Sequence, residues 1–363
     1  MPITILVKPA SSSCNLQCDY CFYKAEADLR YVPNSGTMSF HTLKNLIRKT
    51  LNFGEGPINY AFQGGEPLLS GIAFYEEVIK LQKQYNKNGR FIQNSIQTNA
   101  TLINAEWAEF FKKNRFLIGI SLDGPMVIHD IHRKNASGGS FKKVMSAIEL
   151  LRDYNVDFNI LSVVTPDSYS HGMEIYSFFK HEGFEYIQFI PMLTDNMDKA
   201  DDTQGFGQFL SDVFDCFYQD LKNDDAPYIR NFDNMIGSLM GFYPEACEYM
   251  DSCVENYAIE ADGSVYPCDF YMTDEYLMGN VNTDNSMGLK ESPVMEEFIK
   301  SSYLIPEKCE ACEYFRLCKG GCRRYREIAQ GNHYYCEGFK YFYEKNLDKL
   351  KEIAELKGKG FKL

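Results

Sequence analysis

Three cysteines near the start of the sequence have a spacing that suits an iron–sulfur cluster. Cys14, Cys18 and Cys21 are separated by three and then two residues, directly after a strand-like run. Three thiolates leave one iron of a [4Fe–4S] cube without a protein ligand, and such an open iron can bind a substrate. A structural zinc site normally needs four ligands, and no histidine lies close to these cysteines in the sequence. The loop therefore predicts a cluster that takes part in chemistry.

Eight further cysteines in the C-terminal third predict two more metal centres. Two fully ligated clusters need eight thiolates, and so do two all-cysteine zinc sites. Zinc ribbons pair two C-x2-C knuckles, whereas only Cys309 and Cys312 form one here, so the pattern favours clusters. We expect the isolated Cys216 to be a small buried hydrophobic residue. The eight cysteines are Cys247, Cys253, Cys268, Cys309, Cys312, Cys318, Cys322 and Cys336.

The first 200 residues alternate strand-like and amphipathic helical stretches, which predicts an α/β fold. Six strands joined by helices indicate a parallel sheet with right-handed crossovers, curled into a partial (β/α)6 barrel of the TIM type. Glycines and polar residues follow the strand ends, in QGGEP, QTNA and SLDGP, at the rim where such barrels carry active sites. The predicted strands are Ile3–Lys8, Ile58–Phe62, Ile92–Gln97, Phe116–Ser121, Phe158–Val164 and Ile187–Ile190, and a final helix is predicted over Tyr341–Leu356.

The composition argues against several classes of function. The formal net charge of −13 disfavours a nucleic acid or an anionic membrane as partner, because phosphate groups attract clustered Lys and Arg. No stretch is long and apolar enough for a transmembrane helix, and the first residues, MPITILVKPA, lack the features of a signal peptide. We therefore expect a cytoplasmic protein, in which cysteines are kept reduced and serve metal binding.

The motif CNLQCDYC, followed by QGGEP after the next strand, resembles the landmarks of the radical S-adenosylmethionine superfamily. In that family the open iron chelates the methionine part of S-adenosylmethionine, and reduction of the cluster releases a 5′-deoxyadenosyl radical. The resemblance implies that the first three cysteines hold this cluster. It also implies cofactor contacts from five residues: Tyr20 and Leu193 to the adenine, Gly65 to the methionine part, and Ser121 and Arg133 to the ribose or carboxylate.

The C-terminal cysteines, in the pattern C-x9-G-x4-C and then C-x2-C-x5-C-x3-C, resemble the SPASM domain of peptide-modifying radical enzymes. This likeness implies a first auxiliary [4Fe–4S] cluster on Cys247, Cys253, Cys268 and Cys322, and a second on Cys309, Cys312, Cys318 and Cys336. We accordingly predict a radical S-adenosylmethionine partial-barrel domain over residues 1–235, a small cysteine-rich SPASM domain over 236–340, and a C-terminal helix with a basic tail over 341–363.

Segments along nearly the whole chain resemble the anaerobic sulfatase-maturating enzymes. These enzymes oxidise a Cys or Ser in a C/S-x-P-x-R motif of a sulfatase to Cα-formylglycine, which removes two electrons and requires a proton acceptor. The resemblance implies that Asp269, directly after Cys268, accepts the proton, although PCDF also suits a hydrogen-bonded turn aspartate. It implies as partners a sulfatase polypeptide and an electron donor such as flavodoxin or ferredoxin. The segments are KPASSSCNLQCDYCFY, AFQGGEPLL, SLDGP with IHRKN, YPCDFY, and FRLCKGGCRR.

Two other functions remain open at this point. Another SPASM peptide maturase, which forms thioether or carbon–carbon cross-links on a ribosomal peptide, would share these motifs. Many such enzymes carry a peptide-binding domain ahead of the cysteine loop, and we expect none here. A zinc-stabilised binding scaffold without enzymatic activity would share the cysteines, and an iron and sulfide assay separates it from the enzymes because zinc sites are colourless.

Overall fold

The six predicted strands are present in the computed structural model, which describes residues 3–193 and 203–359. Each lies within one residue of its predicted bounds, so the apolar alternation located them well. They are β1 (Ile3–Val7), β2 (Ile58–Phe62), β3 (Ile92–Thr98), β4 (Leu117–Ser121), β7 (Phe158–Val164) and β8 (Tyr186–Pro191).

The chain divides into two compact units that alternate along the sequence. The first consists of Met1–Ser121, Asp130–Phe158 and Val254–Ile299. The second consists of Leu122–His129, Asn159–Cys253 and Lys300–Leu363. Part of the cysteine-rich region thus belongs with the N-terminal strands. The predicted domain boundaries at 235/236 and 340/341 remain predictions.

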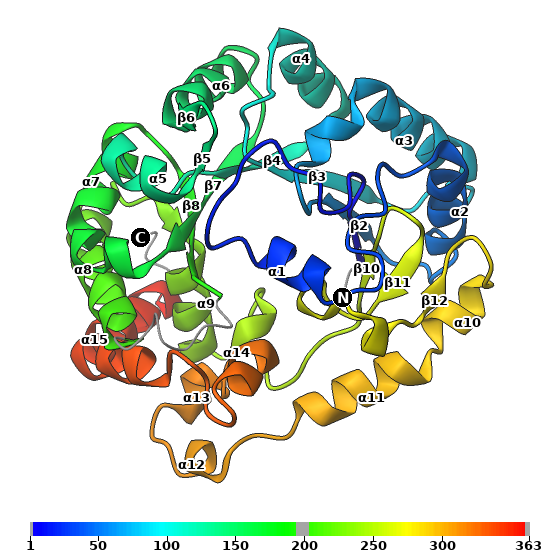
Figure 1. The fold of residues 1–363 in the computed structure, drawn as a ribbon. Coiled ribbons are helices and arrows are strands. Elements are labelled where there is room, and N and C mark those ends of the chain that lie inside the picture. The colour runs from blue at the N-terminus through cyan, green and yellow to red at the C-terminus, as the bar shows by residue number, and fades with distance from the viewer. Residues whose placement is uncertain (1–2, 194–202, 360–363) are drawn as a thin grey trace. The chain divides into compact units, whose positions relative to one another are not determined.

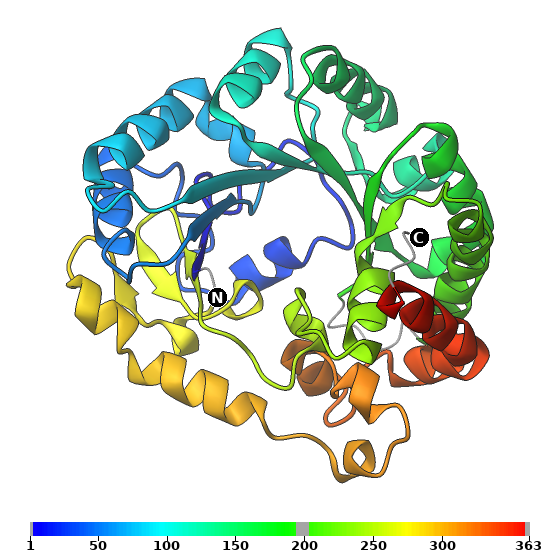
Figure 2. The same cartoon turned by 180° about the vertical axis from the view of Figure 1, so that it is seen from behind.

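The sheet of the first unit joins the beginning of the chain to its last third. Its strand order is β12-β11-β10-β1-β2-β3-β4, and β1 to β4 run parallel. Strand β10 (Asn256–Ile259) pairs in parallel with β1, and Figures 1 and 2 show these strands side by side, one blue and one yellow. Strands β11 (Ser264–Tyr266) and β12 (Gly279–Asn280) continue this edge in antiparallel pairing.

Amphipathic helices line one side of this sheet (Figure 1). In α2 the side chain of Ser39 caps the helix by accepting a hydrogen bond from the Thr42 amide, and Leu43, Leu46 and Ile47 are fully buried at helical spacing. The helices that lie wholly in this unit are α1 (Phe22–Asp28), α2 (Phe40–Thr50), α3 (Ile72–Tyr85), α4 (Ala105–Asn114), α6 (Phe141–Asp153) and α10 (Ser286–Lys290), and β5 (Lys134–Asn135) pairs with β6 (Gly138–Gly139).

The second unit places helices against three neighbouring parallel strands, β7, β8 and β9 (Tyr228–Ile229). No helix among residues 3–193 and 203–359 is long and apolar enough to span a membrane. The helices of this unit are α7 (Gly172–His181), α8 (Thr203–Lys222), α9 (Arg230–Leu239), α12 (Glu307–Glu310), α13 (Phe315–Cys318), α14 (Arg323–Ile328) and α15 (Cys336–Gly358), while α5 (Met126–His132) and α11 (Pro293–Ser302) each begin in one unit and end in the other.

Helix α15 packs against α8 through two glycines that face each other. A Cβ atom on Gly207 would lie 2.1 Å from the Gly338 carbonyl oxygen, and one on Gly338 would lie 2.4 Å from the Thr203 carbonyl oxygen. The helix begins at Cys336, five residues before its predicted start at Tyr341, because the cysteine-rich segment continues directly into it. Residues 360–363 of the predicted basic tail lie outside the described residues.

We predict that Gly207→Ala destabilises the protein by about 1–3 kcal/mol, because the added methyl group cannot fit without separating the two helices. Gly237→Ala in α9 is the matched control, since a Cβ atom there has no neighbour closer than 3.9 Å. This control should leave the stability unchanged or raise it slightly, because alanine favours a helix. Urea unfolding followed by circular dichroism measures both, and equal midpoints would contradict the packing account.

Candidate active site

The three N-terminal cysteines lie on the loop between β1 and α1. Cys14 is exposed, Cys18 and Cys21 are half-buried, and within the described part of the chain none of the three forms a disulfide. The Gln17 amide donates to the Lys134 carbonyl oxygen at 2.8 Å, which ties the loop to the β5–β6 hairpin. The Asn99 side-chain amide lies 3.7 Å from Cys14 Sγ and donates to Asn15 at 2.8 Å. Three thiols on one braced loop fit the donor set of a cluster with an open iron.

The two glycines of QGGEP make room for the chain's own atoms. A Cβ atom on Gly65 would lie 2.2 Å from the Ser13 carbonyl oxygen, and one on Gly64 would lie 2.6 Å from Lys8 Cγ and Cε. Both glycines have positive φ, at +57° and +87°. The close approach therefore serves the packing of β1 and of the cysteine loop, and the contact of Gly65 with the methionine part of the cofactor remains a prediction.

Glu66 in the same motif fastens the cysteine loop to two strand ends. Its buried carboxylate accepts hydrogen bonds from the Leu68 amide, the Thr98 hydroxyl and the Asn99 amide at 2.8–3.0 Å. Its own amide donates to the Ser13 carbonyl oxygen at 2.8 Å. Burial raises the pKa of Glu66 to about 7, although its three hydrogen bonds oppose this rise.

Two of the predicted cofactor contacts come together in the first unit. The Arg133 guanidinium carbon lies 5.4 Å from the centre of the Tyr20 ring, over its face, and Arg133 is buried. His132 was not predicted as a site residue, yet its ring lies 5.4 Å from that of Tyr20 and its Nδ1 is 2.6 Å from the Asp19 carboxylate. It stands beside Arg133 in the quoted segment IHRKN, which was the available signal.

The other two predicted contacts lie at strand ends. Ser121 closes β4, and its hydroxyl accepts a hydrogen bond from Gln97 at 3.0 Å. Leu193 follows β8 in the second unit and is half-buried. The assignment of both residues to S-adenosylmethionine stays a prediction.

The carboxylate of Asp269 is held by one oxygen only. Oδ2 accepts hydrogen bonds from the Tyr23 hydroxyl at 2.6 Å and the Gln63 side-chain amide at 2.7 Å. Oδ1 is buried, and the described residues offer it no hydrogen-bond partner. These contacts reach side chains distant in the sequence and none to turn backbone, unlike those of an ordinary turn aspartate. Burial raises the pKa of Asp269, while nearby Lys8 opposes this rise.

A group of buried charges surrounds this carboxylate. Lys8 is fully buried, with Nζ 3.7 Å from a Glu260 oxygen and 4.8 Å from the centre of the Tyr23 ring. Arg30 also pairs with Glu260, and although burial raises the pKa of Glu260, the two cations hold it below its usual value. Burial raises the pKa of Glu26 to about 7. The sequence carries no direct signal for this group, because lysine and glutamate are seldom buried.

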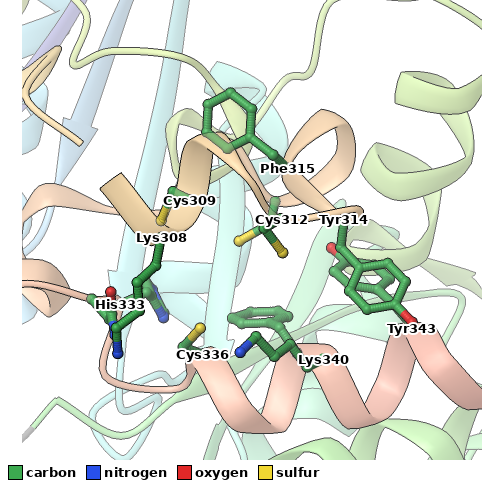
Figure 3. A pocket seen from close by; sticks show the side chains of 13 residues that line it. Lys308, Cys309, Cys312, Tyr314, Phe315, His333, Cys336, Lys340 and Tyr343 are labelled. Atoms are coloured by element: carbon green, nitrogen blue, oxygen red, sulfur yellow. The ribbon is translucent and has the colours of Figure 1, made fainter. Parts of the chain in front are cut away.

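Four of the C-terminal cysteines surround one cavity in the second unit. Figure 3 shows the sulfur atoms of Cys309, Cys312 and Cys336 near the same space, and Cys318 also lines it. The thiols come from α12, the turn after it, the end of α13 and the start of α15. Desolvation raises the pKa of the Cys318 thiol to about 12, so this thiol stays protonated without a metal. This all-cysteine donor set fits a fully ligated [4Fe–4S] cluster.

Three of the remaining cysteines also lie near one another. Desolvation raises the pKa of Cys322 to about 12, and Cys247 and Cys253 add to the rise by their proximity. The Cys253 amide is held by the Ser302 hydroxyl at 2.8 Å. Cys268, the fourth ligand implied by the resemblance, belongs to the first unit. The grouping of these four as one cluster stays a prediction.

Cys216 differs from the small hydrophobic residue that we expected. It is half-buried on α8, and the acidic side chains of Asp220, Asp215 and Asp212 lie close enough to raise the pKa of its thiol further, after desolvation.

The comparisons with known proteins agree along the whole chain. The model of the Radical SAM superfamily matches residues 9–179, and the SPASM iron-sulfur cluster-binding domain matches residues 247–313. A cysteine-type anaerobic sulfatase-maturating enzyme of Clostridium perfringens (strain 13 / Type A) is 40% identical over 97% of this chain and 98% of its own. A serine-type anaerobic sulfatase-maturating enzyme of Bacteroides thetaiotaomicron is 32% identical over 94% of this chain and 89% of its own.

A solved structure shows the same likeness in three dimensions. Native anSMEcpe with bound AdoMet and Cp18Cys peptide matches with a TM-score of 0.92 at 38% sequence identity, over 98% of this chain and 99% of that chain. The predicted fold class and family are thereby confirmed. The chain belongs to the family of anaerobic sulfatase-maturating enzymes, which are radical S-adenosylmethionine enzymes with a SPASM domain.

Proposed function

We propose that this chain oxidises a cysteine of a sulfatase polypeptide to Cα-formylglycine. The single observation that carries this is the Asp269 carboxylate, held by Tyr23 and Gln63 directly after the predicted ligand Cys268, in a chain of this family. A cysteine substrate is favoured over a serine because the cysteine-type relative is 40% identical and the serine-type relative 32%. The bound peptide in the solved structure of anSMEcpe supports a polypeptide substrate.

The cofactors of the family are S-adenosylmethionine and [4Fe–4S] clusters, and the cysteines of this chain suit three such clusters. When bound, the first cluster and S-adenosylmethionine supply a 5′-deoxyadenosyl radical that removes a hydrogen atom from the substrate. Cys14, Cys18 and Cys21 would hold that cluster. The stacked pair of Tyr20 and Arg133 would hold the nucleoside and its charged groups, with Gly65, Ser121 and Leu193 as the remaining contacts.

The chain's own part in the chemistry is to take up a proton. Oxidation of a cysteine side chain to a thioaldehyde removes one hydrogen atom from Cβ and one further electron, and it releases the thiol proton. Water then hydrolyses the thioaldehyde to the aldehyde and releases hydrogen sulfide. With Oδ2 of Asp269 fixed by two donors, Oδ1 is the oxygen left to receive that proton. A base held in one orientation transfers a proton efficiently when it lies within hydrogen-bond reach of the substrate. The buried Lys8 favours the ionised state of Asp269 that this role requires.

The alternatives are less well supported. Cross-link formation on a ribosomal peptide is less well supported because a relative 40% identical, which matches along both chains, is a sulfatase-maturating enzyme. A zinc scaffold would not need the Asp269 arrangement. We also propose that an electron donor of the flavodoxin or ferredoxin kind serves the enzyme, and that the enzyme works in the cytoplasm, where its twelve cysteines stay reduced.

The first prediction from the proposed function concerns the metal content. Anaerobic reconstitution should load about twelve iron atoms per chain, as three cubane clusters require. The combined Cys14→Ala, Cys18→Ala and Cys21→Ala variant should lose about a third of this iron and all cleavage of S-adenosylmethionine, because no open iron remains. Cys216→Ala should keep both. Iron assay and chromatography of 5′-deoxyadenosine measure the outcome, and deoxyadenosine from the triple variant would refute the assignment.

The second prediction isolates the base. Asp269→Asn keeps the size of the side chain and an oxygen acceptor but cannot take a proton at neutral pH. Formylglycine production should fall by about a hundredfold or more, which is the usual contribution of a positioned base. Iron content and cleavage of S-adenosylmethionine should persist. Asp262→Asn, at an exposed turn of the same unit, is the control. If the Asp269→Asn variant makes the aldehyde at the wild-type rate, Asp269 has no part in the mechanism.

The third prediction concerns the substrate. A peptide with C-x-P-x-R, incubated with reductant and S-adenosylmethionine, should show by mass spectrometry the change from cysteine to formylglycine. The matched S-x-P-x-R peptide should react more slowly, in keeping with the cysteine-type relatives. Cleavage of S-adenosylmethionine with both peptides unchanged would instead favour another SPASM peptide modification.

A further inference from the structure

His333 borders the cavity that the four cysteines of the second auxiliary site surround. It is 5% exposed, and Figure 3 shows it at the edge of the same space as Cys309 and Cys336. Its ring packs among aromatic neighbours, with the rings of Tyr325 at 5.0 Å and Phe339 at 5.4 Å between centres. The N–H group of a buried imidazole needs a hydrogen-bond acceptor, and here the imidazole lies beside four thiols.

The hydrogen bonds of His333 determine which ring nitrogen carries the proton. The Tyr335 amide donates to Nδ1 at 3.2 Å, so Nδ1 is the acceptor. The proton of the neutral ring is therefore on Nε2. The ring stays neutral because burial, with nearby Arg326, lowers its pKa to about 3. Within the part of the chain that the structure describes, no residue accepts a hydrogen bond from Nε2.

Gly321 provides the room for this edge of the ring. A Cβ atom on Gly321 would lie 2.3 Å from His333 Cδ2 and 2.8 Å from Nε2, and its φ is +67°. Gly321 stands between the ligands Cys318 and Cys322. The Nε2 edge of the ring thus packs against the backbone segment that carries these thiols.

We propose that His333 donates its Nε2–H to the cluster held by Cys309, Cys312, Cys318 and Cys336 and thereby raises the reduction potential of that cluster. This rests on the proposed function, in which the chain carries three [4Fe–4S] clusters, and on the assignment of one of them to these four thiols that the SPASM resemblance implies. A reduced cluster carries one more negative charge than an oxidised one, so a donor to its sulfurs stabilises the reduced state more. The consequence is a better acceptor for the electron that leaves the substrate.

The cationic side chain of Lys340 at the same cavity is a weaker candidate for this role. Lys340 lines the cavity, but its side chain is 43% exposed and pairs with Glu337 at 3.1 Å. Water and the paired carboxylate screen its charge. The buried imidazole lies in a less polar environment, where a hydrogen bond has a larger electrostatic effect.

The test is an EPR-monitored redox titration of the anaerobically reconstituted full chain. His333→Phe keeps a ring for the packing with Tyr325 and Phe339 but has no N–H. It should lower the potential of one auxiliary cluster, with a change of about tenfold in its reduction equilibrium, or about 59 mV for one electron. His333→Gln retains a side-chain N–H and should shift the potential less. The wild-type iron content tests the cluster assignment separately.

Two outcomes would overturn the proposal. One is a His333→Phe protein that holds its three clusters at unchanged potentials. The other is an equal shift in the Phe and Gln variants, which would report altered packing. A further measurement does not depend on the folding of any variant: wild-type protein labelled with 15N-histidine should show a nitrogen coupling to a reduced auxiliary cluster in pulsed EPR. The absence of that coupling would also refute the proposal.

Discussion

The first unit depends on a carboxylate buried between two cations. Glu260 follows β10, Lys8 follows β1, and Arg30 lies just after α1, so one ion cluster connects three segments that are far apart in the sequence. Charges buried in this way are tolerated only when each has a partner, because an unpaired charge away from water is strongly destabilising. Removal of any one of these side chains would leave another charge buried without a partner, so the ion group holds the β10–β11 edge beside the cysteine loop.

That arrangement brings Asp269 to side chains from the beginning of the chain. Tyr23 follows the last cysteine of the loop, and Gln63 opens the QGGEP motif, so the two residues that orient the carboxylate belong to the two segments that mark the family. The Lys8 side chain packs against Gly64, pairs with Glu260 and lies over the Tyr23 ring. Cluster loop, cofactor motif and candidate base therefore share one buried polar network.

The sequence predicted the parts of this molecule that local patterns control. Alternation located six strands to within one residue, and cysteine spacing separated the radical-cluster loop from the auxiliary set. The parallel pairing of β10 with β1 was not predicted, because β10 is short and its partner lies far away in the sequence. Spacing also could not reveal that Gly64 and Gly65 accommodate Lys8 and Ser13, since this depends on which segments approach them. His132 and His333 were passed over because neither stands within a metal-binding spacing.

The pairing of β1 with β10 also has a consequence for biosynthesis. Strand β1 ends at Val7 and its partner begins at Asn256, so the hydrogen-bonding edge of β1 on that side has no native partner until about 250 more residues have been made. At a synthesis rate of about 5–20 residues per second this interval is roughly 12–50 s. An unpaired strand edge is a template for pairing with other chains. The nascent protein is therefore exposed to aggregation through the β1 edge during this interval.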